Sequence, residues 1–408
     1  NILNIFCIIF KKPYTCPVFK AYKYRLYPTN SQKELIHKHC GSVRFLYNLA
    51  LETKQMAYAG SKVNLSCFDL IKQLPDLKNE LPWLKECNSQ SLQAPIRNLD
   101  NAFTKFFKGQ ADFPKFKKKS NRGSFNVPQN VIVSDKQLII PKFKEGIKIK
   151  LHRDLVGAVK QATVSFTPTG KYFVSILCDT GEELPTKLPV KESTAVGVDL
   201  GIKDFAITSD GQIFDNPKHL RKAQSKLKYI QRKYSKNKGK RTRLKLAKLH
   251  EKVVNKRTDR LHKVSSELIK NHDSIAIENL NVSGMLKNHC LAQSISDVSW
   301  STFTTMLKYK AEWNGVNILE IGRFDPSSKT CSNCGSINKE LTLKDREWTC
   351  KSCSTEHDRD INAAVNIKNF ALKNHLTTEH SLKNQGKLPT LVGALTLEAH
   401  SSPFGMGE

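Results

Sequence analysis

Four cysteines in the C-terminal part of the chain are spaced as metal ligands. Cys331, Cys334, Cys350 and Cys353 give the pattern C-x2-C-x15-C-x2-C. Each pair can form a tight turn that presents two thiolates, and a short hairpin between the pairs can bring them together. Four thiolates in a tetrahedron suit Zn²⁺ and leave no position open for a substrate, so the zinc is expected to be structural. Because so small a unit cannot bury its own core, zinc binding should supply its folding energy.

Three carboxylates stand at comparable places beside predicted elements. Asp199 ends the apolar run AVGVD, Glu278 ends the apolar run IAIE, and Asp360 begins the helix after the last cysteine pair. Acids at the ends of neighbouring strands converge at one edge of a sheet, where an acid from a facing helix can complete a cluster. Carboxylate oxygens suit Mg²⁺, and two such ions could activate water and stabilise the leaving oxygen of a phosphodiester. We expect these three acids to be the catalytic residues and the magnesium ligands.

Each acid taken singly has a common alternative explanation, because strand-end Asp and Glu are often caps or surface residues. Their joint occurrence in a basic chain, with Gly197 and Gly201 beside the first, favours the catalytic interpretation. Asp204 is assigned to a turn, Asp358 to the surroundings of the site or to the surface, and His357 to a structural role. The chain has no G-x-S-x-G, Walker or H-E-x-x-H motif, so nothing supports nucleophilic catalysis.

The composition indicates a nucleic-acid partner. The chain has 408 residues, enough for two or three domains, and a formal net charge of +29 at pH 7. Such an excess of Lys and Arg favours polyanions, and its spread through the chain argues against a membrane surface. Seven of the eleven cysteines lie outside the metal pattern without a disulfide framework, which is typical of a reducing cytosol. We expect a cytoplasmic protein, associated with the nucleoid in a prokaryote.

The N-terminal half reads as strands with a helical insertion. Short alternating runs over 18–28 and 125–180 predict an antiparallel barrel. Between them, Asn30 or Ser31 is expected to cap a helix that runs through about Ala59 and is ended by Gly60, and shorter helices follow. The apolar residues 1–10 are too short to span a bilayer and lack the features of a signal peptide.

Two segments of the second half are distinctive. Residues 181–193 carry two prolines and no periodicity, so they are the predicted domain boundary. Residues 218–263 are expected to form a basic helical hairpin with one apolar stripe, in which Glu251 and Asp259 are the only acids. A soluble surface normally mixes charges of both signs, so this hairpin is predicted to follow phosphates.

At these motifs the chain resembles the TnpB family of transposon-encoded RNA-guided DNA endonucleases, which are related to the type V CRISPR effectors. The runs GVDLGIKDFA, IAIENL, PSSKTCSNCG and HDRDINAAVNI are similar to the RuvC-like nuclease blocks of that family. The opening KAYKYRLYPTNSQKELI and the later FPKFKKK are similar to its N-terminal blocks, so the likeness covers about residues 20–370.

The resemblance implies an α/β RNase H-like (RuvC) nuclease domain with an inserted four-cysteine zinc ribbon, preceded by an N-terminal β-barrel (wedge) domain with a helical recognition insertion. The family's catalytic acids match Asp199, Glu278 and Asp360, and its zinc ligands match the four cysteines. The implied organisation is 1–17 as an extension of uncertain status, 18–30 and 110–182 as the wedge, 31–109 as the insertion, 193–327 and 357–375 as the nuclease core, 328–356 as the ribbon, and 376–408 as a flexible tail.

The expected activity is Mg²⁺-dependent hydrolysis of target DNA beside a short adjacent motif, guided by an RNA derived from the transposon end. The partners are then this guide RNA and double-stranded target DNA, with no membrane, and the protein is expected to be a monomer. Two alternatives stay open at this stage. One is a catalytically idle RNA-guided repressor, and the other is a transposase that joins DNA strands with similar carboxylates.

Overall fold

The chain forms two units that divide between Glu183 and Leu184, inside the proline-containing segment predicted as the boundary. The computed structural model describes residues 18–342 and 344–384, with side chains described as far as residue 377. The predicted extension and most of the predicted tail therefore lie outside the described residues. Each unit is considered by itself, because each has its own core.

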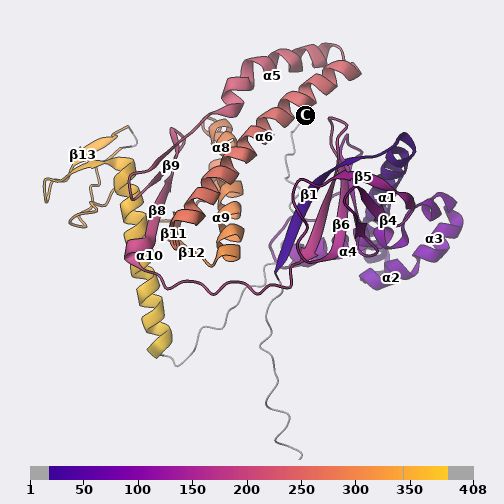
Figure 1. Cartoon of the computed structure of the whole chain (residues 1–408), viewed down its shortest axis with the longest axis horizontal. Coiled ribbons are helices and arrows are strands. Elements are labelled where there is room, and N and C mark those ends of the chain that lie inside the picture. The colour runs from indigo at the N-terminus through magenta and orange to yellow at the C-terminus, as the bar shows by residue number, and fades with distance from the viewer. Residues whose placement is uncertain (1–17, 343, 385–408) are drawn as a thin grey trace, which may run out of the picture. The chain divides into compact units, whose positions relative to one another are not determined.

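The N-terminal unit combines one antiparallel sheet with a group of helices (Figure 1). Its elements in chain order are β1 (Phe19–Tyr27), α1 (Asn30–Ser61), α2 (Cys67–Lys72), α3 (Leu74–Glu80), the 3-10 turn η1 (Pro82–Glu86), α4 (Ser89–Phe107), β2 (Gly123–Val127), β3 (Ile132–Val133), β4 (Gln137–Ile140), β5 (Phe143–Lys150), β6 (Ala158–Phe166) and β7 (Tyr172–Asp179). The helices thus lie between the first strand and the other six in the sequence.

The seven strands follow the order β2-β6-β7-β1-β5-β4-β3, and every pair of neighbours in this order is antiparallel. β1 lies in the middle of the sheet although it comes first in the sequence. No ladder joins the end strands β2 and β3 among the described residues, so closure into a barrel stays a prediction. Side chains that alternate along β1, β6 and β7 bury one face, as the period of two requires.

Helix α1 begins one residue earlier than the sequence suggests. Its N-cap is Thr29, whose hydroxyl accepts from the backbone of Gln32 while the Gln32 side chain accepts from the backbone of Thr29. The helix continues past Gly60 and ends at Lys62, which adopts a left-handed conformation with φ 53°. The expected cap at Asn30 or Ser31 and the expected end at Gly60 are therefore wrong by one or two residues.

The C-terminal unit contains a second sheet with helices on both faces (Figure 1). Its elements are the 3-10 turn η2 (Glu192–Thr194), β8 (Ala195–Leu200), β9 (Asp204–Thr208), β10 (Ile213–Asp215), α5 (His219–Lys236), α6 (Lys240–Asn271), β11 (Ser274–Glu278), α7 (Val282–Met285), α8 (Ala292–Val298), α9 (Trp300–Asn314), β12 (Asn317–Ile321), β13 (Glu347–Thr349), β14 (Glu356–Asp358) and α10 (Arg359–Asn384). The strand order is β10-β9-β8-β11-β12, in which β8, β11 and β12 are parallel and β9 and β10 are antiparallel.

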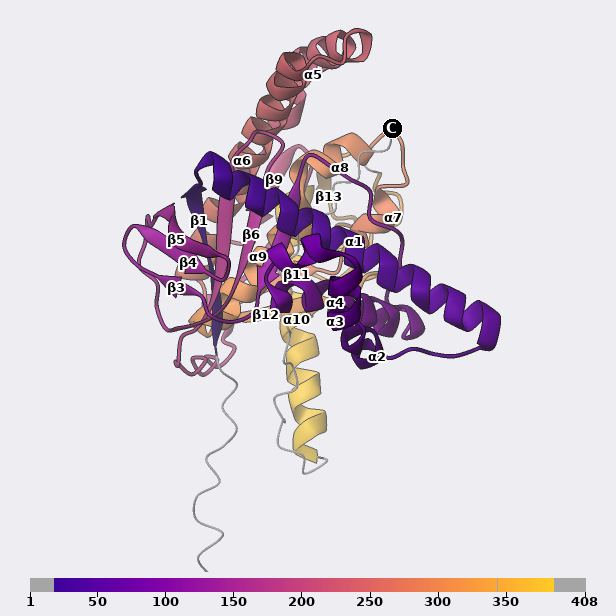
Figure 2. The same ribbon diagram turned by 90° about the vertical axis from the view of Figure 1, so that its right-hand side faces the viewer.

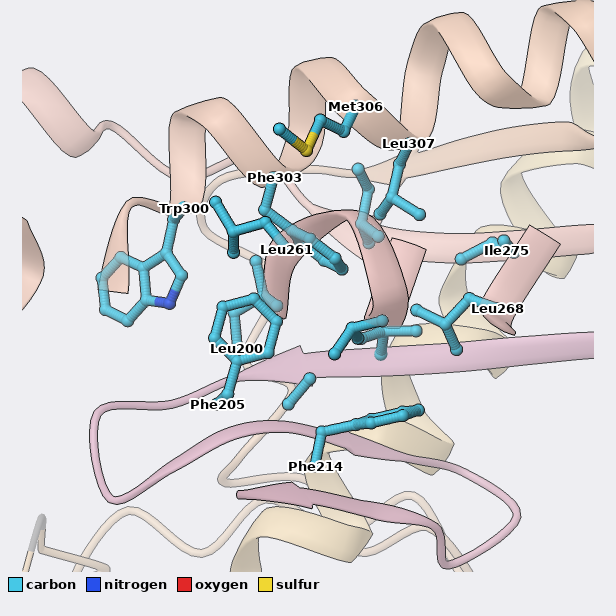
Figure 3. Close-up of a cluster of buried hydrophobic side chains, with 14 of the residues drawn as sticks. Leu200, Phe205, Phe214, Leu261, Leu268, Ile275, Trp300, Phe303, Met306 and Leu307 are labelled. Atoms are coloured by element: carbon cyan, nitrogen blue, oxygen red, sulfur yellow. The ribbon is translucent and has the colours of Figure 1, made fainter. Parts of the chain in front are cut away.

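A large apolar core covers one face of this sheet (Figure 3). Val198 and Ile277 project from neighbouring strands into this core, where they meet side chains of α6, α8 and α9 such as Leu268 and Phe303. The opposite face carries a smaller core, in which Ala276 meets Ile367 of α10. The sheet is therefore a middle layer between α6, α8 and α9 on one side and α10 on the other.

Helices α5 and α6 form the predicted basic hairpin and project together away from the sheet (Figures 1 and 2). Helix α6 is a continuous helix of 32 residues, and its last turns join the core of the sheet through Leu261, Val264 and Leu268. The outer part of the hairpin is held by packing of the two helices on each other, which leaves its cationic side chains exposed.

Helix α10 extends to Asn384, nine residues into the segment predicted as a tail. Residues 376–384 are therefore helical, and the rest of that segment lies outside the described residues. Across the described residues, no helix combines the length and the apolar character needed to cross a membrane.

Candidate active site and metal centre

Strand geometry places Asp199 and Glu278 side by side. In β8, Val196, Val198 and Leu200 enter the large core, so the alternate residues Gly197 and Asp199 face α10. The parallel register pairs Gly197 with Ala276 and Val198 with Ile277, and each carboxylate residue follows directly after this last pair. Both acids therefore lie on the α10 face at the carboxyl ends of adjacent parallel strands.

Small residues let α10 approach this face closely. A Cβ atom at Gly197 would lie 2.0 Å from the carbonyl oxygen of Ala364 and 2.7 Å from the backbone nitrogen of Lys368, which no side chain can accommodate. Ala276 lies opposite Gly197 in the register, and Ala363 and Ala364 are buried on the helix. The helix thus rests almost directly on the backbone of β8, and its first turn carries Asp360 towards the strand ends.

The electrostatics of Asp199 show that the three acids are neighbours. Burial raises the pKa of Asp199 to about 7, and the charges of Glu278 and Asp360 raise it as well, while Arg359 opposes them. Desolvation and nearby like charges both disfavour an ionised carboxylate. That these three acids form one metal site stays a prediction.

Asp360 is held by two guanidinium groups. Arg346 donates from Nη1 to Oδ2 of Asp360 at 2.9 Å, and Arg359 donates from Nη2 to Oδ1 at 2.8 Å. The backbone amides of Asp360 and Ile361 both donate to Oδ1 of Asp358 at 2.9 Å, so Asp358 caps the first turn of α10. The assignment of Asp358 to the surroundings of the site is consistent with this capping role.

Glu278 is oriented by a residue that the sequence did not suggest. The hydroxyl of Ser327 donates to Oε1 of Glu278 at 2.7 Å. The backbone of this segment is in turn held by α10, because the buried Asn366 side chain donates to the carbonyls of Ser327 at 2.8 Å and Thr330 at 2.6 Å. Asn362, one turn earlier, donates to Thr330 and accepts from the amide of Ser332. Two Asn residues at i and i+4 on the buried side of an apolar helix are the signal that could have revealed this connection.

The four predicted cysteines form one compact cluster. Their sulfur atoms all lie within 4.8 Å of one another, and the Cys331–Cys353 and Cys334–Cys350 pairs are 3.6 Å apart. Four thiolates about 2.3 Å from one zinc ion would be separated by similar distances, so this donor set fits Zn²⁺. Hydrogen bonds from the side chain and the backbone of Thr355 lower the pKa of Cys353, which favours its thiolate, whereas hydrogen bonding to Cys353 raises the pKa of Cys334.

His357 lies beside the cysteine cluster. Its Nε2 atom lies 3.1 Å from Sγ of Cys331, and its ring packs against Trp348, with ring centroids 4.8 Å apart. Trp348 and His357 are also paired across the two-stranded ladder of β13 and β14. This ladder joins the cysteine cluster to α10, because β14 ends at Asp358, two residues before Asp360.

The three carboxylates are less tightly gathered than the cysteines. Within the described part of the chain, the cysteines are the group of at least three possible ligands whose donor atoms all lie within 4.8 Å of one another. Asp360 forms ion pairs with Arg346 and Arg359 instead. The donor set itself fits Mg²⁺, since these are hard carboxylate oxygens at one edge of a sheet, one of them with a raised pKa.

Three family models match the chain. One described as "Probable transposase" matches residues 175–289, and one described as "Cas12f1-like, TNB domain" matches residues 300–367, so together they contain all three acids and all four cysteines. A model described as "Helix-turn-helix domain" matches residues 18–62, which here form β1 and the single continuous helix α1.

The relatives that match most of the chain include two whose names begin "Putative RNA-guided DNA endonuclease" and that are more than 30% identical to it. The protein of Streptomyces pristinaespiralis is 37% identical over 361 residues, which covers 86% of this chain and 89% of the relative. The InsQ protein of Escherichia coli K12 is 32% identical over 373 residues, which covers 85% of this chain and 91% of the relative. This chain belongs to the TnpB family. The resemblance seen in the sequence motifs is thereby confirmed over about 86% of this TnpB-family chain.

One solved structure of a Cas12f1–sgRNA–target DNA complex aligns with 86% of this TnpB-family chain and 99% of its own. The two are 16% identical with a TM-score of 0.35, a likeness too low to support an argument about the arrangement of either unit.

Proposed function

We propose that this chain is an RNA-guided, Mg²⁺-dependent DNA endonuclease of a transposable element. The observation that carries the proposal is the position of Asp199 and Glu278 on adjacent parallel strands, on the face that receives Asp360 from α10. Membership of the TnpB family and the net charge of +29 support a nucleic-acid substrate. We propose that the protein acts in the cytoplasm of a prokaryote, in association with the DNA of the nucleoid.

The C-terminal unit is proposed to be an RNase H-like nuclease core. Its sheet has three antiparallel strands, β10, β9 and β8, followed by the parallel strands β11 and β12, with helices on both faces. The cysteine cluster lies between β12 and α10, as an inserted zinc ribbon would. For the N-terminal unit, we propose a wedge barrel, with α1 to α4 as its recognition insertion.

The three acids would hold the catalytic magnesium, with Ser327 orienting Glu278 and the first turn of α10 orienting Asp360. When bound, Mg²⁺ would activate the attacking water and stabilise the charge that develops on the leaving oxygen. Arg346 and Arg359 balance the charge of Asp360 beforehand. Base pairing with a guide RNA from the transposon end would select the target, while the protein holds the duplex backbone and reads a short adjacent motif.

The direct test is a cleavage assay with the zinc-loaded full chain and the RNA that co-purifies with it, after sequencing that RNA. The target is a plasmid library that carries the complementary sequence beside randomised base pairs. We expect Mg²⁺-dependent cuts in a subset of plasmids that share a short motif, and binding without cuts for Asp199→Asn. Target binding by the wild-type chain without cleavage would support the repressor instead, and joined strands would support the transposase.

A further inference from the structure

Phe324 is the most exposed large apolar side chain among the described residues, with 92% of its surface accessible. It lies in the turn 322–327 that follows β12. The other exposed residues beside it in this turn are Gly322, Arg323 and the proline Pro326, so within residues 322–327 the ring is the one large apolar side chain that is exposed. A protein partner would require a contiguous patch around such an anchor, whereas one isolated ring suits a planar ligand.

The turn that carries Phe324 is held in place at both ends. The amide of Gly322 donates to Oδ2 of Asp325 at 2.8 Å, and the amide of Ser327 donates to the carbonyl of Asp325 at 2.8 Å. At its far end, the carbonyl of Ser327 accepts from the side chain of Asn366. The exposed ring is therefore presented by a turn with fixed ends, which lowers the entropy lost when a ligand packs on it.

The turn also lies next to the catalytic carboxylates. β12 is the parallel neighbour of β11, and its last residue, Ile321, pairs with Glu278. Phe324 follows three residues later, at the edge of the sheet that carries Asp199 and Glu278. The same turn ends at Ser327, whose hydroxyl bonds Glu278 at 2.7 Å. One short segment thus carries both an exposed aromatic ring and a group that orients a catalytic acid.

We propose that Phe324 stacks on an unpaired base of the DNA strand next to the scissile phosphate and so positions that phosphate over the acids. Every nucleobase offers an aromatic face, so stacking positions a strand without reading its sequence. The positive charge of the chain as a whole favours a polyanionic partner over an uncharged lipid. This inference deepens the proposed function and rests on it, and Phe324 is a positioning residue in it.

Three substitutions separate stacking from simple apolar contact. Phe324→Ala removes the ring, Phe324→Leu keeps an apolar side chain without a π face, and Phe324→Trp restores an aromatic face. Because the side chain is 92% exposed, none of them should change the melting temperature of the protein. Ile213→Ala is the control, since Ile213 is an exposed apolar side chain (57%) on β10, at the opposite end of the strand order from β12.

The experiment uses the RNA-loaded full chain and target DNA with a single 2-aminopurine placed in turn at each position of the two target strands. In Mg²⁺-free buffer, we expect fluorescence quenching at one position, abolished in Phe324→Ala and Phe324→Leu but kept in Phe324→Trp and Ile213→Ala. On adding Mg²⁺, kcat should fall by about 5- to 100-fold in the first two variants, with target affinity unchanged.

Equal activity of the Leu and Trp variants, or quenching that does not depend on Phe324, would overturn the proposal. Failure of the proposed function gives a different result, because a wild-type chain that cannot cut would still show Phe324-dependent quenching in the Mg²⁺-free complex. A chain that cuts normally without such quenching would refute the stacking role and leave the nuclease intact.

Discussion

At the scale of single residues, the proposed chemistry depends on Asp199, whose surroundings disfavour the ionised form of its carboxyl group. Asp199 has a pKa of about 7 because burial and the charges of Glu278 and Asp360 disfavour its ionised form. Bound divalent cations reverse this balance, since they neutralise the carboxylates that repel one another. Repulsion between the acids therefore destabilises the metal-free protein, and cation binding removes this repulsion.

The raised pKa predicts how the stability of the metal-free protein depends on pH. The folded state holds the Asp199 proton up to about pH 7, whereas an unfolded Asp loses it near pH 4. The folded state therefore binds more protons in this window, and its stability falls as the pH rises from about 4 to 7. In Asp199→Asn, this loss should shrink, and the variant should be more stable than wild type above pH 7 by up to a few kcal/mol.

Thermal melts of both proteins in metal-depleted buffer with zinc retained would measure this difference. Addition of Mg²⁺ should then raise the melting temperature of wild type more than that of Asp199→Asn. A wild-type protein that becomes more stable than the variant on going from pH 5 to pH 8 without Mg²⁺ would contradict the assignment.

The arginines beside Asp360 lead to a second prediction. Arg346 competes with a divalent cation for the Asp360 carboxylate, and it is about half exposed. Because an exposed ion pair is worth roughly 0.2–1 kcal/mol, Arg346→Gln should tighten Mg²⁺ binding by up to about fivefold. Titration calorimetry would measure it, with Lys351→Gln as the control, which removes an exposed pair with Glu340 in the same cysteine unit. If Arg346→Gln binds Mg²⁺ no more tightly than wild type does, Arg346 does not compete with the cation for Asp360.

The sequence identified the acids but not the residues that hold them. Asp199 and Glu278 could be recognised because each ends a short apolar run, a pattern visible within five residues. Ser327 and Arg346 gave no such signal, because their hydrogen bonds join segments that are separate in the chain, and these bonds exist only once the sheet and α10 have packed.

At the scale of elements, the site depends on how closely α10 approaches β8. Gly197 and Ala276 occupy paired positions on the face that receives the helix, so the backbone of α10 can reach the strand. A larger side chain at either position would move the helix outwards and carry Asp360 away from the other acids. The distance between the acids is thus set by two small residues that take no part in the chemistry.

Gly197→Ala tests this packing. The added Cβ would lie 2.0 Å from the carbonyl oxygen of Ala364, so the helix must shift, and we expect destabilisation of roughly 1–3 kcal/mol. The Mg²⁺-induced rise in melting temperature should shrink as well. Gly41→Ala in α1 is the control, because a Cβ there meets no atom within 4 Å and should be neutral or stabilising. Wild-type stability of Gly197→Ala under denaturant would show that the close approach is not needed.

The cysteine cluster supports the same helix from its other end. Cys350→Ser should lower the zinc content of the purified protein and release the ladder that positions Asp360, so cleavage should fall steeply. Cys290→Ser is the control, because Cys290 is exposed and lies outside the cluster. Zinc can be measured by mass spectrometry and cleavage in the plasmid assay. Full activity of Cys350→Ser with zinc absent would show that the cluster does not support the site.

Element types could be predicted from the sequence better than element ends and pairings. The cationic hairpin, the strands that carry the acids and the division near residue 183 follow from periodicity and composition. The cap of α1 could not be settled, because Thr29, Asn30 and Ser31 are all good caps and only the Gln32 side chain selects the first of them. The central place of β1 in its sheet depends on long-range pairing that no local pattern encodes.

At the scale of the whole molecule, the charge of +29 should govern binding to RNA and DNA. We expect affinity to fall steeply with salt, because each phosphate that the protein neutralises releases counterions. Changing the exposed Lys240, Arg241 and Arg243 of α6 to Gln should reduce the slope of log K against log salt by about 0.7–0.9 for each phosphate that the variant no longer binds. The control variant changes Lys339, Lys344 and Lys351 to Gln, which removes the same number of positive charges from another part of the chain. An unchanged slope in the α6 variant would exclude the hairpin from phosphate binding.

The central claim is that three acids from β8, β11 and α10 together hold divalent cations. Anomalous diffraction from crystals of the full chain soaked in Mn²⁺, a substitute for Mg²⁺, tests it most directly. The account predicts anomalous density between the carboxylates of Asp199, Glu278 and Asp360, with Asp360 released from Arg346. Ordered Mn²⁺ bound elsewhere, with Asp360 still paired to Arg346 and too far from the other two acids to share an ion, would contradict it.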